Sequence, residues 1–512
     1  MNIQENIESE ITTLAKGAFV STIGNISGRV LNVAAQIMIA RALSPEFFGL
    51  YALGWVIMRL LSPFADFGVR RMITVYGPQF WLVDESRMQR VIKISFLLGV
   101  LVAFLLAVLL LVSSNQIAVL IFNNAQINPV IQAFAFILFF QTIMWIGESL
   151  TMVTLDMRYQ VWTSDIIQPL TNFVLIAIFL RMGLGFDGVL KATIISFIIA
   201  SIFSIIFVIM LFRKVFLAEF IKDPPISELI TSSISGILPS LFLGILPWLN
   251  RLLLGVVRPV WDVGIFQAAS QFSLLFSLII MGVNSVLGPI IAKFNFSGDK
   301  QKELNEIYIL TTKWIIYFAL PISIVTFAVP KLIILVLFGE NFVDGAIALQ
   351  ILTIGQIISL ATGATGTLLV NSKHINSLSK TALIGLVITI IFTPLFSVSM
   401  GISGAAFAMA LAYGVISIVT VIQVRRNLGI WPYDKRYWKG LLSAIISIVI
   451  CSGLRILTHD LQSFWQLGII SIGTLVSFVL SLFLLGLDVE DNLVINLLMG
   501  KINILFGFTR KI

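Results

Sequence analysis

Four polar side chains interrupt the first long apolar stretch of the sequence, STIGNISGRVLNVAAQIMIARAL at residues 21–43. Asn25, Arg29, Asn32 and Gln36 are spaced by four, three and four residues, which places them along one face of an α-helix. A guanidinium group binds phosphate oxygens through two parallel hydrogen bonds and stays charged when partly desolvated. Amides both donate to and accept from hydroxyl groups. The stripe therefore has the chemistry of a surface that binds anions and hydroxyls.

Three further apolar segments carry polar residues at helical spacing. The polar residues of the first segment are Arg59, Ser62, Asp66 and Arg70; those of the second are Gln141 and Glu148; those of the third are Asp165, Gln168 and Asn172. A charge near the centre of a bilayer costs a few kcal/mol on insertion scales and ~10 kcal/mol or more in simulations. We therefore expect these side chains to face protein or water rather than lipid.

Each embedded charge has a structural alternative. Arg29 either binds a ligand anion or pairs with Asp66 or Glu148 to join helices. Arg59 and Arg251 fit both interpretations equally, and Lys313 either binds a ligand or extends along its helix to the membrane surface. The carboxylates Asp66, Glu148 and Asp165 are candidates for ion pairing or for proton coupling. The amides at 25, 32, 36, 168, 172, 271 and 284 suit either sugar hydroxyls or helix packing.

The composition is that of a membrane protein. Hydrophobic residues make up 58% of the 512 residues, charged residues make up 11%, and the mean hydropathy is +1.03. The single Cys451 and the distant His374 and His459 argue against a disulfide or a metal centre. The sequence contains no phosphate-binding loop of the G-x-x-x-x-G-K-[ST] type. We expect no metal, no cofactor and no nucleotide hydrolysis by this chain.

Apolar runs of about 20 residues predict about fourteen membrane-spanning helices in an all-α protein. The predicted spans are 15–40, 48–72, 91–113, 129–152, 161–182, 188–213, 229–256, 263–291, 305–329, 345–369, 377–399, 403–424, 438–457 and 465–486. Most of the 33 Lys and Arg residues fall on one side of this arrangement, which predicts cytoplasmic termini in a cell inner membrane. The stretch GPQFWLVDESRMQR would then be cytoplasmic and SSNQIAVLIFNNAQIN external. The net charge of +8 then faces anionic lipid, with no need for a nucleic acid partner.

Three pairs of short segments indicate an internal repeat. EFFGLYAL at 46 resembles WDVGIFQA at 261, IAVLIFNNA at 117 resembles IILVLFGEN at 333, and GFDGVLKA at 185 resembles GISGAAFA at 401. The nearly constant offset predicts two six-helix lobes of parallel topology, at 11–214 and 225–427. Two appended helices at 438–486 and an interfacial segment at 490–512 would follow. In transporters built from repeats, the substrate path lies between the copies.

The segments IARALSPEFFGLYAL, ADFGVRRMITVYGP and LNRLLLGVVRPVWDVGIFQAASQF resemble polysaccharide-export flippases of the multidrug/oligosaccharidyl-lipid/polysaccharide (MOP) exporter superfamily. The resemblance implies a transporter, not an enzyme, that moves a polyprenyl-diphosphate-linked glycan to the outer leaflet by alternating access. The translocated glycan would be used to build a surface polysaccharide such as O-antigen or lipopolysaccharide. Expected partners are the lipid-linked glycan, membrane lipids, and the glycosyltransferases and polymerase of glycan assembly. Many relatives have an aspartate at the position of Asn250. This chain therefore lacks a carboxylate that could couple transport.

This resemblance assigns roles to the polar residues. Arg29 would bind the diphosphate while Asn25, Asn32 and Gln36 contact sugars, and the further substrate-binding candidates are Arg59, Asn250, Arg251 and Lys313. A multidrug or organic-cation antiporter of the same superfamily is the alternative, although its cavity should be dominated by carboxylates or aromatic rings. A membrane glycosyltransferase or polymerase is disfavoured because the predicted outer connections are short and carry no catalytic constellation.

Overall fold

The computed structural model describes residues 24–66, 68–80, 85–154, 156–217, 237–292, 301–372, 374–486, 488 and 491. Within these ranges the chain is helical and contains no strand. Twelve helices of the described part are long and apolar enough to cross a membrane. The predicted all-α, polytopic membrane fold is therefore confirmed.

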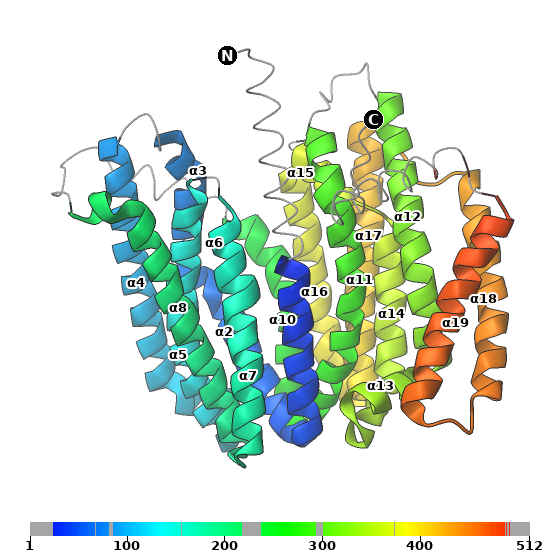
Figure 1. The fold of residues 1–512 in the computed structure, drawn as a ribbon, viewed down its shortest axis with the longest axis horizontal. Coiled ribbons are helices and arrows are strands. Elements are labelled where there is room, and N and C mark those ends of the chain that lie inside the picture. Colours follow the sequence, from blue (N-terminus) through cyan, green and yellow to red (C-terminus); the bar gives the residue numbers. More distant parts are fainter. Residues whose placement is uncertain are drawn as a thin grey trace, which may run out of the picture. The chain divides into compact units, whose positions relative to one another are not determined.

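The first half of the chain begins with a helix over residues 24–42. The helices that follow are α2 (Pro45–Asp66), α3 (Val69–Phe80), α4 (Glu85–Gln116), α5 (Asn128–Met152), α6 (Arg158–Gln160), α7 (Gln168–Arg181), α8 (Gly185–Leu217) and α10 (Ile237–Val257). Short turns of other helix types are η1 (Ile117–Ile121), η2 (Ala125–Ile127) and η3 (Val161–Ile167), of which η1 and η3 are π-helical. Figure 1 shows these helices in blue to green.

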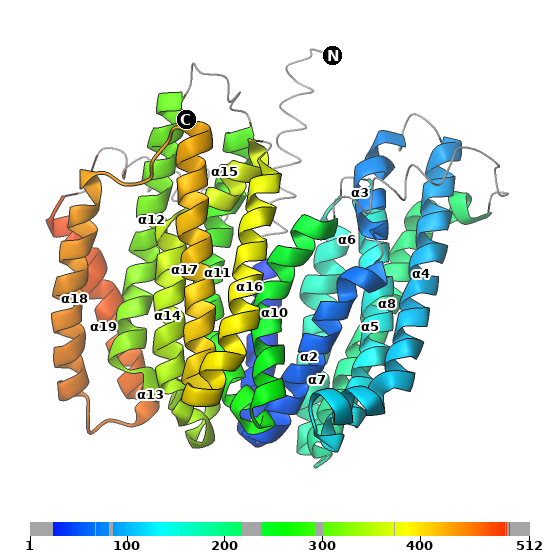
Figure 2. The same ribbon diagram turned by 180° about the vertical axis from the view of Figure 1, so that it is seen from behind.

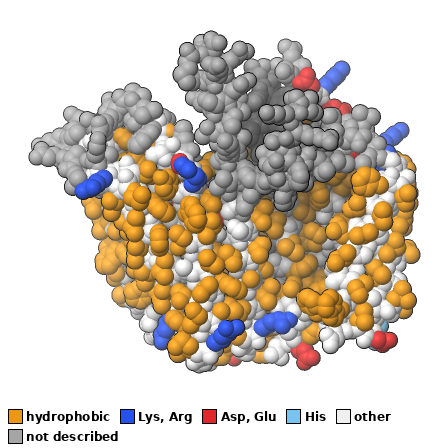
Figure 3. Space-filling model, viewed as in Figure 1, with side chains coloured by type: hydrophobic (Ala, Val, Ile, Leu, Met, Phe, Trp, Pro, Cys, Tyr) orange, Lys and Arg blue, Asp and Glu red, His pale blue; other side chains and the backbone are white. Residues whose placement is uncertain are grey.

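The second half continues in the same manner. Its helices are α11 (Val260–Ala292), α12 (Gln301–Ala328), α13 (Pro330–Phe338), η4 (Glu340–Gly345), α14 (Ala346–Ala361), α15 (Thr365–Asn371), α16 (Ile375–Met400), α17 (Ile402–Leu428), η5 (Lys435–Tyr437), α18 (Trp438–Leu457) and α19 (Ser463–Leu484). The predicted interfacial segment 490–512 lies outside the described residues except for Asp491. Figure 3 shows charged side chains at the ends of the viewed helices and hydrophobic side chains over their middle, as a membrane span requires.

Each of the predicted spans overlaps a described helix, with three differences. The span 345–369 is interrupted, because α14 ends at Ala361 and Gly363 adopts a φ of 70° before α15 begins. The span 48–72 is broken, because α2 ends at Asp66 and Gly68 adopts a φ of 74° before α3 begins. The stretch SSNQIAVLIFNNAQIN, expected as a connection, is largely helical because the apolar run IAVLI extends α4 as the π-helical turn η1. The helical segment stops before Asn123, whose positive φ of 48° does not continue a right-handed helix.

Packing divides the chain into two units that differ from the predicted lobes. Unit 1 comprises residues 1–272, 337–348 and 375–412, and unit 2 comprises residues 273–336, 349–374 and 413–512. In unit 1, α5 packs on α4 and α8, while α10 packs on α2 and α16. In unit 2, α18 packs on α19 and both contact α12 (Figure 2). Because packing and sequence repetition are different properties, the two lobes stay a prediction.

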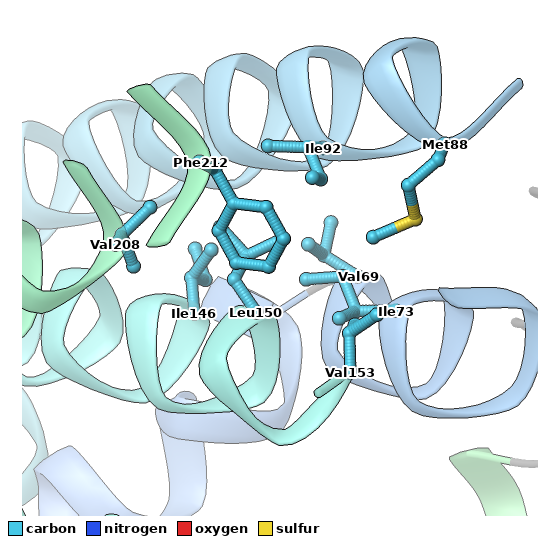
Figure 4. Close-up of a cluster of buried hydrophobic side chains, with 9 residues drawn as sticks. All are labelled: Val69, Ile73, Met88, Ile92, Ile146, Leu150, Val153, Val208 and Phe212. Carbon is cyan, nitrogen blue, oxygen red and sulfur yellow. The ribbon is translucent and has the colours of Figure 1, made fainter. Parts of the chain in front are cut away.

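A hydrophobic cluster fixes the end of unit 1 at which α2 gives way to α3. Its buried side chains come from α3, α4, α5, the residue that follows α5, and α8, and they lie around Phe212 (Figure 4); the cluster consists of Val69, Ile73, Met88, Ile92, Ile146, Leu150, Val153, Val208 and Phe212. Close packing of this kind leaves little room for adjustment. It therefore fixes α5 relative to the start of α3, where Arg70 lies.

The repeated segments meet in a reciprocal contact. A Cβ atom on Gly49 would come within 2.1 Å of the carbonyl oxygen of Val260, and one on Gly264 within 1.9 Å of the carbonyl oxygen of Pro45. In the predicted repeat, residues 45 and 49 correspond to 260 and 264, so the two segments contact each other through the same pair of positions. Such a self-complementary contact is what a two-fold relation between the copies predicts.

Candidate functional site

Three tryptophan rings surround an arginine inside unit 1. The guanidinium carbon of Arg59 on α2 lies 5.5 Å from the ring centroid of Trp55, one turn earlier on the same helix. It lies 5.5 Å from the ring of Trp145 on α5 and 5.7 Å from the ring of Trp248 on α10. Because α5 and α10 both pack against α2, residues far apart in the sequence form one aromatic cage around the cation.

The same rings link Arg59 to two further arginines. Trp145 also lies 4.8 Å from the guanidinium carbon of Arg70, and Trp248 lies 5.1 Å from that of Arg251. Three cations therefore alternate with two tryptophan rings, in the order Arg70, Trp145, Arg59, Trp248, Arg251. We call these five residues the Arg–Trp ladder.

The outer two cations of the Arg–Trp ladder have polar partners. The Nε of Arg70 donates to the hydroxyl of Ser149 over 3.3 Å. The side chain of Arg251, which is 5% exposed, donates to the hydroxyl of Ser270 over 2.8 Å and to the carbonyl oxygen of Pro247 over 3.3 Å. These acceptors are neutral, so the bonds orient the two guanidinium groups. The charge of Arg70 also lies within electrostatic range of the Asp66 and Glu148 carboxylates.

The central cation has the least compensation. Among the described residues, Arg59 forms no ion pair within 4.0 Å, and its buried Nε has no hydrogen-bond partner. A cation over an aromatic face gains about 0.5–1 kcal/mol when exposed and about 2 kcal/mol or more when desolvated. A buried polar atom without a partner costs about 1–3 kcal/mol. The cage therefore stabilises the charge while leaving the buried Nε without an acceptor.

The predicted polar stripe lies on the helix over residues 24–42. Arg29 is exposed, and Asn25, Asn32 and Gln36 are half-buried. The Oε1 of Gln36 accepts hydrogen bonds from the amides of Gln267, over 3.0 Å, and Gln271 on α11. The Nδ2 of Asn32 donates to the carbonyl oxygen of Gly28 over 2.9 Å. The stripe thus changes from a helix-joining amide cluster at Gln36 to an exposed cation at Arg29.

Two glycines bring this helix into close contact with η3. A Cβ on Gly28 would lie 2.7 Å from the carbonyl oxygen of Asp165, and one on Gly24 would lie 2.4 Å from a methyl group of Val161. Glycines four residues apart permit such approach between membrane helices. The approach places Arg29 within electrostatic range of the Asp165 carboxylate.

The embedded carboxylates have different surroundings. Glu148, 4% exposed on α5, accepts hydrogen bonds from the hydroxyl of Thr163, over 2.9 Å, and from that of Ser164. Asp66 accepts from the backbone N–H of Arg70 over 3.0 Å, which caps the start of α3. The Oδ2 of Asp165 is buried without a hydrogen-bond partner. Asp66 and Glu148 are therefore engaged locally, whereas Asp165 retains an available acceptor.

Asn250 joins three helices. It is fully buried, and its Nδ2 donates to the hydroxyl of Thr393 on α16 over 2.9 Å and to the carbonyl oxygen of Ala405 on α17 over 3.1 Å. A carboxylate at this position would have no N–H to donate to these acceptors. The asparagine thus fits its packing environment better than the aspartate expected from the resemblance.

Lys313 belongs to unit 2 and is neutralised there. Its Nζ, on a side chain only 1% exposed, lies 2.7 Å from a carboxylate oxygen of Asp488 and 2.8 Å from one of Asp491. Asp488 is also paired with Lys439 on α18 over 2.7 Å. We call these four residues the Lys313 network. The structure therefore gives Lys313 two carboxylate partners, while the arginine candidates Arg59 and Arg251 come together in the Arg–Trp ladder.

Reasoning from the sequence missed the tryptophans. Trp55 precedes Arg59 by four residues and Trp248 precedes Arg251 by three, so each pair shares a helix face. That spacing was the available signal, whereas Trp145 is distant in the sequence from both Arg59 and Arg251. Among the described residues, no group of three His, Cys, Asp or Glu side chains could hold a metal ion. The side chain of Asn284 lies outside the described residues.

Comparison with solved structures places the fold. The lipid II flippase MurJ in an inward closed conformation has a TM-score of 0.68 and 16% identity, covering 90% of this chain and 98% of that one. An inward-facing multidrug resistance MATE family transporter of the MOP superfamily has a TM-score of 0.62 and 17% identity, covering 80% and 98%. The MATE multidrug transporter DinF-BH, solved in a complex, has a TM-score of 0.57 and 18% identity, covering 81% and 95%. These likenesses show a shared fold.

Sequence comparison identifies the family. No curated protein sequence matches the chain at the level required of a relative. A family model described as "Polysaccharide biosynthesis protein" matches residues 38–347, which is more than half of the chain. The match includes the whole Arg–Trp ladder. The chain therefore belongs to this family of polysaccharide biosynthesis proteins, and it shares its fold with membrane transporters of the MOP superfamily.

Proposed function

We propose that the protein is a flippase for a polyprenyl-diphosphate-linked oligosaccharide or related glycan used in surface polysaccharide synthesis. It would move the substrate from the cytoplasmic to the outer leaflet of a cell inner membrane by alternating access of two lobes, with both termini in the cytoplasm. O-antigen precursors are one such substrate, made by glycosyltransferases and consumed by a polymerase. The family and the transporter fold support the class of function.

The observation that carries the proposal is the central cation of the Arg–Trp ladder. Arg59 lies in a membrane-spanning helix, within a tryptophan cage and without a described carboxylate partner. A diphosphate supplies the missing charge, and its oxygens can accept the guanidinium N–H groups in a bidentate geometry. Charge-assisted hydrogen bonds of this type contribute about 1.5–3 kcal/mol each. Anion binding therefore resolves the energetic conflict that an embedded cation creates.

The neighbouring arginines extend this binding surface. Arg70 and Arg251 each share a tryptophan ring with Arg59, so an anion bound at Arg59 has a further cation on either side. A diphosphate carries more than one charge and can bridge two guanidinium groups. Flat tryptophan faces offer the apolar ring surface that a sugar or an isoprenoid segment can cover.

Arg29 would provide a second contact to the diphosphate. It is exposed on the helix over residues 24–42, and Asp165 lies within its electrostatic range. We assign Asp165 the role of orienting Arg29 when substrate is absent. Asn25 and Asn32, both half-buried beside it, would contact sugar hydroxyls, whereas the bonds of Gln36 to α11 favour a role in helix packing.

A multidrug or organic-cation antiporter is the second candidate, because solved structures with this fold include multidrug transporters. The buried Glu148 and the available acceptor of Asp165 lie in the same unit as the tryptophans. Carboxylates and aromatic faces are the groups that bind an organic cation. However, Glu148 already accepts two hydroxyl hydrogen bonds, and the Arg–Trp ladder repels a cation.

Transport by the purified chain in proteoliposomes distinguishes the two candidates. One assay follows translocation of a fluorescent polyprenyl-diphosphate oligosaccharide across the bilayer, and the other follows uptake of a fluorescent cationic dye of the rhodamine class. The flippase proposal predicts translocation of the glycan lipid, strong loss with Arg59→Gln, and no dye transport that depends on Arg59. Dye transport that Arg59→Gln leaves intact or increases, together with no glycan translocation, would instead establish the antiporter.

A further inference from the structure

A cavity of about 260 Å³ lies in unit 2, between α12, the connection before α18 and the first turn of α18. Its walls include Tyr317 and Leu320 of α12, Tyr433 and Tyr437 of the connection, and Leu441 of α18. Apolar cavities of about 150 Å³ already admit a benzene-sized molecule and stay free of water. This cavity therefore has room for a substantial apolar group.

The tyrosines present their rings rather than their hydroxyls to the cavity. The hydroxyl of Tyr433 donates to the carbonyl oxygen of Ala361 over 3.0 Å, and that of Tyr437 to the carbonyl oxygen of Pro432 over 2.6 Å. The hydroxyl of Tyr317 donates to the carbonyl oxygen of Arg436 over 3.4 Å. Because all three donors are used by the backbone, the cavity offers mainly hydrocarbon contacts.

The one acidic residue in the wall is already neutralised. The carboxylate of Asp434 is paired with the guanidinium of Arg436 and accepts the backbone N–H of the same residue over 2.8 Å. Arg436 also pairs with Glu306 over 2.8 Å. The cavity therefore has no spare negative charge with which to bind a cation.

The surface beside the cavity is basic and aromatic. Arg425, Arg426 and Lys435 are all exposed. The guanidinium carbon of Arg425 lies 4.9 Å from the ring centroid of Trp431, whose ring lies 5.4 Å from Tyr433 in the cavity wall. A cluster of Lys and Arg residues at the end of a membrane helix attracts anionic lipid headgroups, by about 1 kcal/mol per residue.

We propose that this region is a binding site for one anionic membrane phospholipid. An acyl chain fills the cavity between α12 and α18, and the headgroup phosphate contacts Lys435 and the adjacent arginines. The lipid is available because α18 is a candidate membrane span, and Leu441 at the cavity wall is 59% exposed on it. Charge complementarity selects an anionic headgroup, and the apolar wall selects its chain. The site lies within unit 2 and does not depend on the glycan substrate.

Native mass spectrometry of the full chain in detergent, titrated with dioleoyl phosphatidylglycerol, tests the proposal. The wild type should retain one lipid, and Lys435→Gln should weaken binding about fivefold, as expected for the loss of one basic contact. Leu441→Trp should abolish retention by filling the cavity, and Leu320→Phe is the replacement if that variant does not fold. Lys331→Gln, at another exposed lysine of the described chain, is the matched control and should bind as the wild type.

Two further ligands separate the contributions of headgroup and chain. Dioleoyl phosphatidylcholine, with no net charge, should bind more weakly than dioleoyl phosphatidylglycerol. Glycerol phosphate, which has no acyl chains, should not bind. Equal retention of the two lipids, or binding of free glycerol phosphate with wild-type affinity, would overturn the assignment. Unchanged phosphatidylglycerol binding in Lys435→Gln or in the folded cavity-filling variants would overturn it as well.

Discussion

The Lys313 network and the Arg–Trp ladder each hold a cation inside a membrane-spanning helix, Lys313 on α12 and Arg59 on α2, by opposite means. Lys313 has carboxylate oxygens of Asp488 and Asp491 at 2.7 and 2.8 Å. Arg59 has three tryptophan rings at 5.5–5.7 Å and no described carboxylate within ion-pair distance. The first arrangement is electrically complete, whereas the second is open to a further negative charge.

This difference separates a structural cation from a binding cation. A buried ion pair connects segments distant in sequence, and removal of one partner leaves an isolated charge. Removal of an arginine that is stabilised by aromatic faces costs the fold less stability, because no counter-charge is left behind. Substitutions in the Lys313 network should therefore change stability, and substitutions at Arg59 should change substrate handling.

The largest effect on stability is expected for Lys313→Met. The variant leaves the buried carboxylate of Asp491 without its cation, and breaking a buried pair in this way costs about 3–5 kcal/mol. The free energy of unfolding in detergent and the membrane abundance measure the loss. The double variant K313M/D491N should recover much of it, because the isolated charge is removed. If the stability of K313M were within about 0.5 kcal/mol of that of an exposed control, K331M, Lys313 would not be a structural cation.

Arg59→Met should reduce transport with little loss of stability. Loss of one charge-assisted contact to the diphosphate of about 1.5–3 kcal/mol corresponds to about a 10- to 150-fold decrease. Arg59→Lys should be intermediate, since it keeps the charge but loses the planar fork. Glycan translocation at matched protein abundance measures the effect. If Arg59→Met instead abolished folding and left residual transport per folded molecule unchanged, Arg59 would be structural like Lys313.

The reciprocal glycine contact provides a stability reference between these extremes. Gly264→Ala would bring a Cβ within 1.9 Å of a carbonyl oxygen, and Gly49→Ala within 2.1 Å of the equivalent one. Overpacking typically costs about 1–3 kcal/mol, and we expect similar values at the two positions. Gly453→Ala is the control, because nothing lies within 4 Å of its added Cβ. Clearly unequal losses of thermal stability at 49 and 264 would argue against a two-fold relation of the repeats.

The smallest effect concerns pH and Asp488. Partial burial acts to raise the pKa of this carboxyl, but hydrogen bonds from Lys313 and Lys439 outweigh it and lower the pKa below its usual value. The ionised form therefore contributes stability above about pH 4, the unfolded value, and the contribution is lost as pH falls through the folded pKa. The gain for a partly exposed pair is at most about 1 kcal/mol. The difference in Tm between the wild type and D488N should shrink below pH 4; a difference that grows on acidification would contradict this assignment.

The helices could be predicted from hydropathy alone, because lipid requires a continuous apolar run for each span. The predicted segment 438–457 coincides with α18. The break between α2 and α3 was missed because the apolar pattern continues through it, whereas the backbone turns at Gly68. Local pattern therefore determines which segments are helical better than it determines where each helix ends.

The candidate site was predictable only in part. The embedded charges at Arg29, Arg59 and Lys313 are visible in the sequence because each interrupts an apolar run. Their partners are not, because Trp145 and Trp248 reach Arg59 from other helices. The partners of Lys313 are 175 and 178 residues away in the sequence. Helical periodicity reports which residues share a face but not which other helix that face contacts.

Equilibrium binding of a polyprenyl-diphosphate oligosaccharide to the purified chain in nanodiscs tests the central claim, that the caged Arg59 binds the substrate anion. The wild type should bind the diphosphate lipid more tightly than the corresponding monophosphate. Arg59→Gln should raise the Kd about 10- to 150-fold and remove most of this preference, while K331Q should change neither. An unchanged Kd and an unchanged diphosphate preference in a folded Arg59→Gln variant would contradict the account.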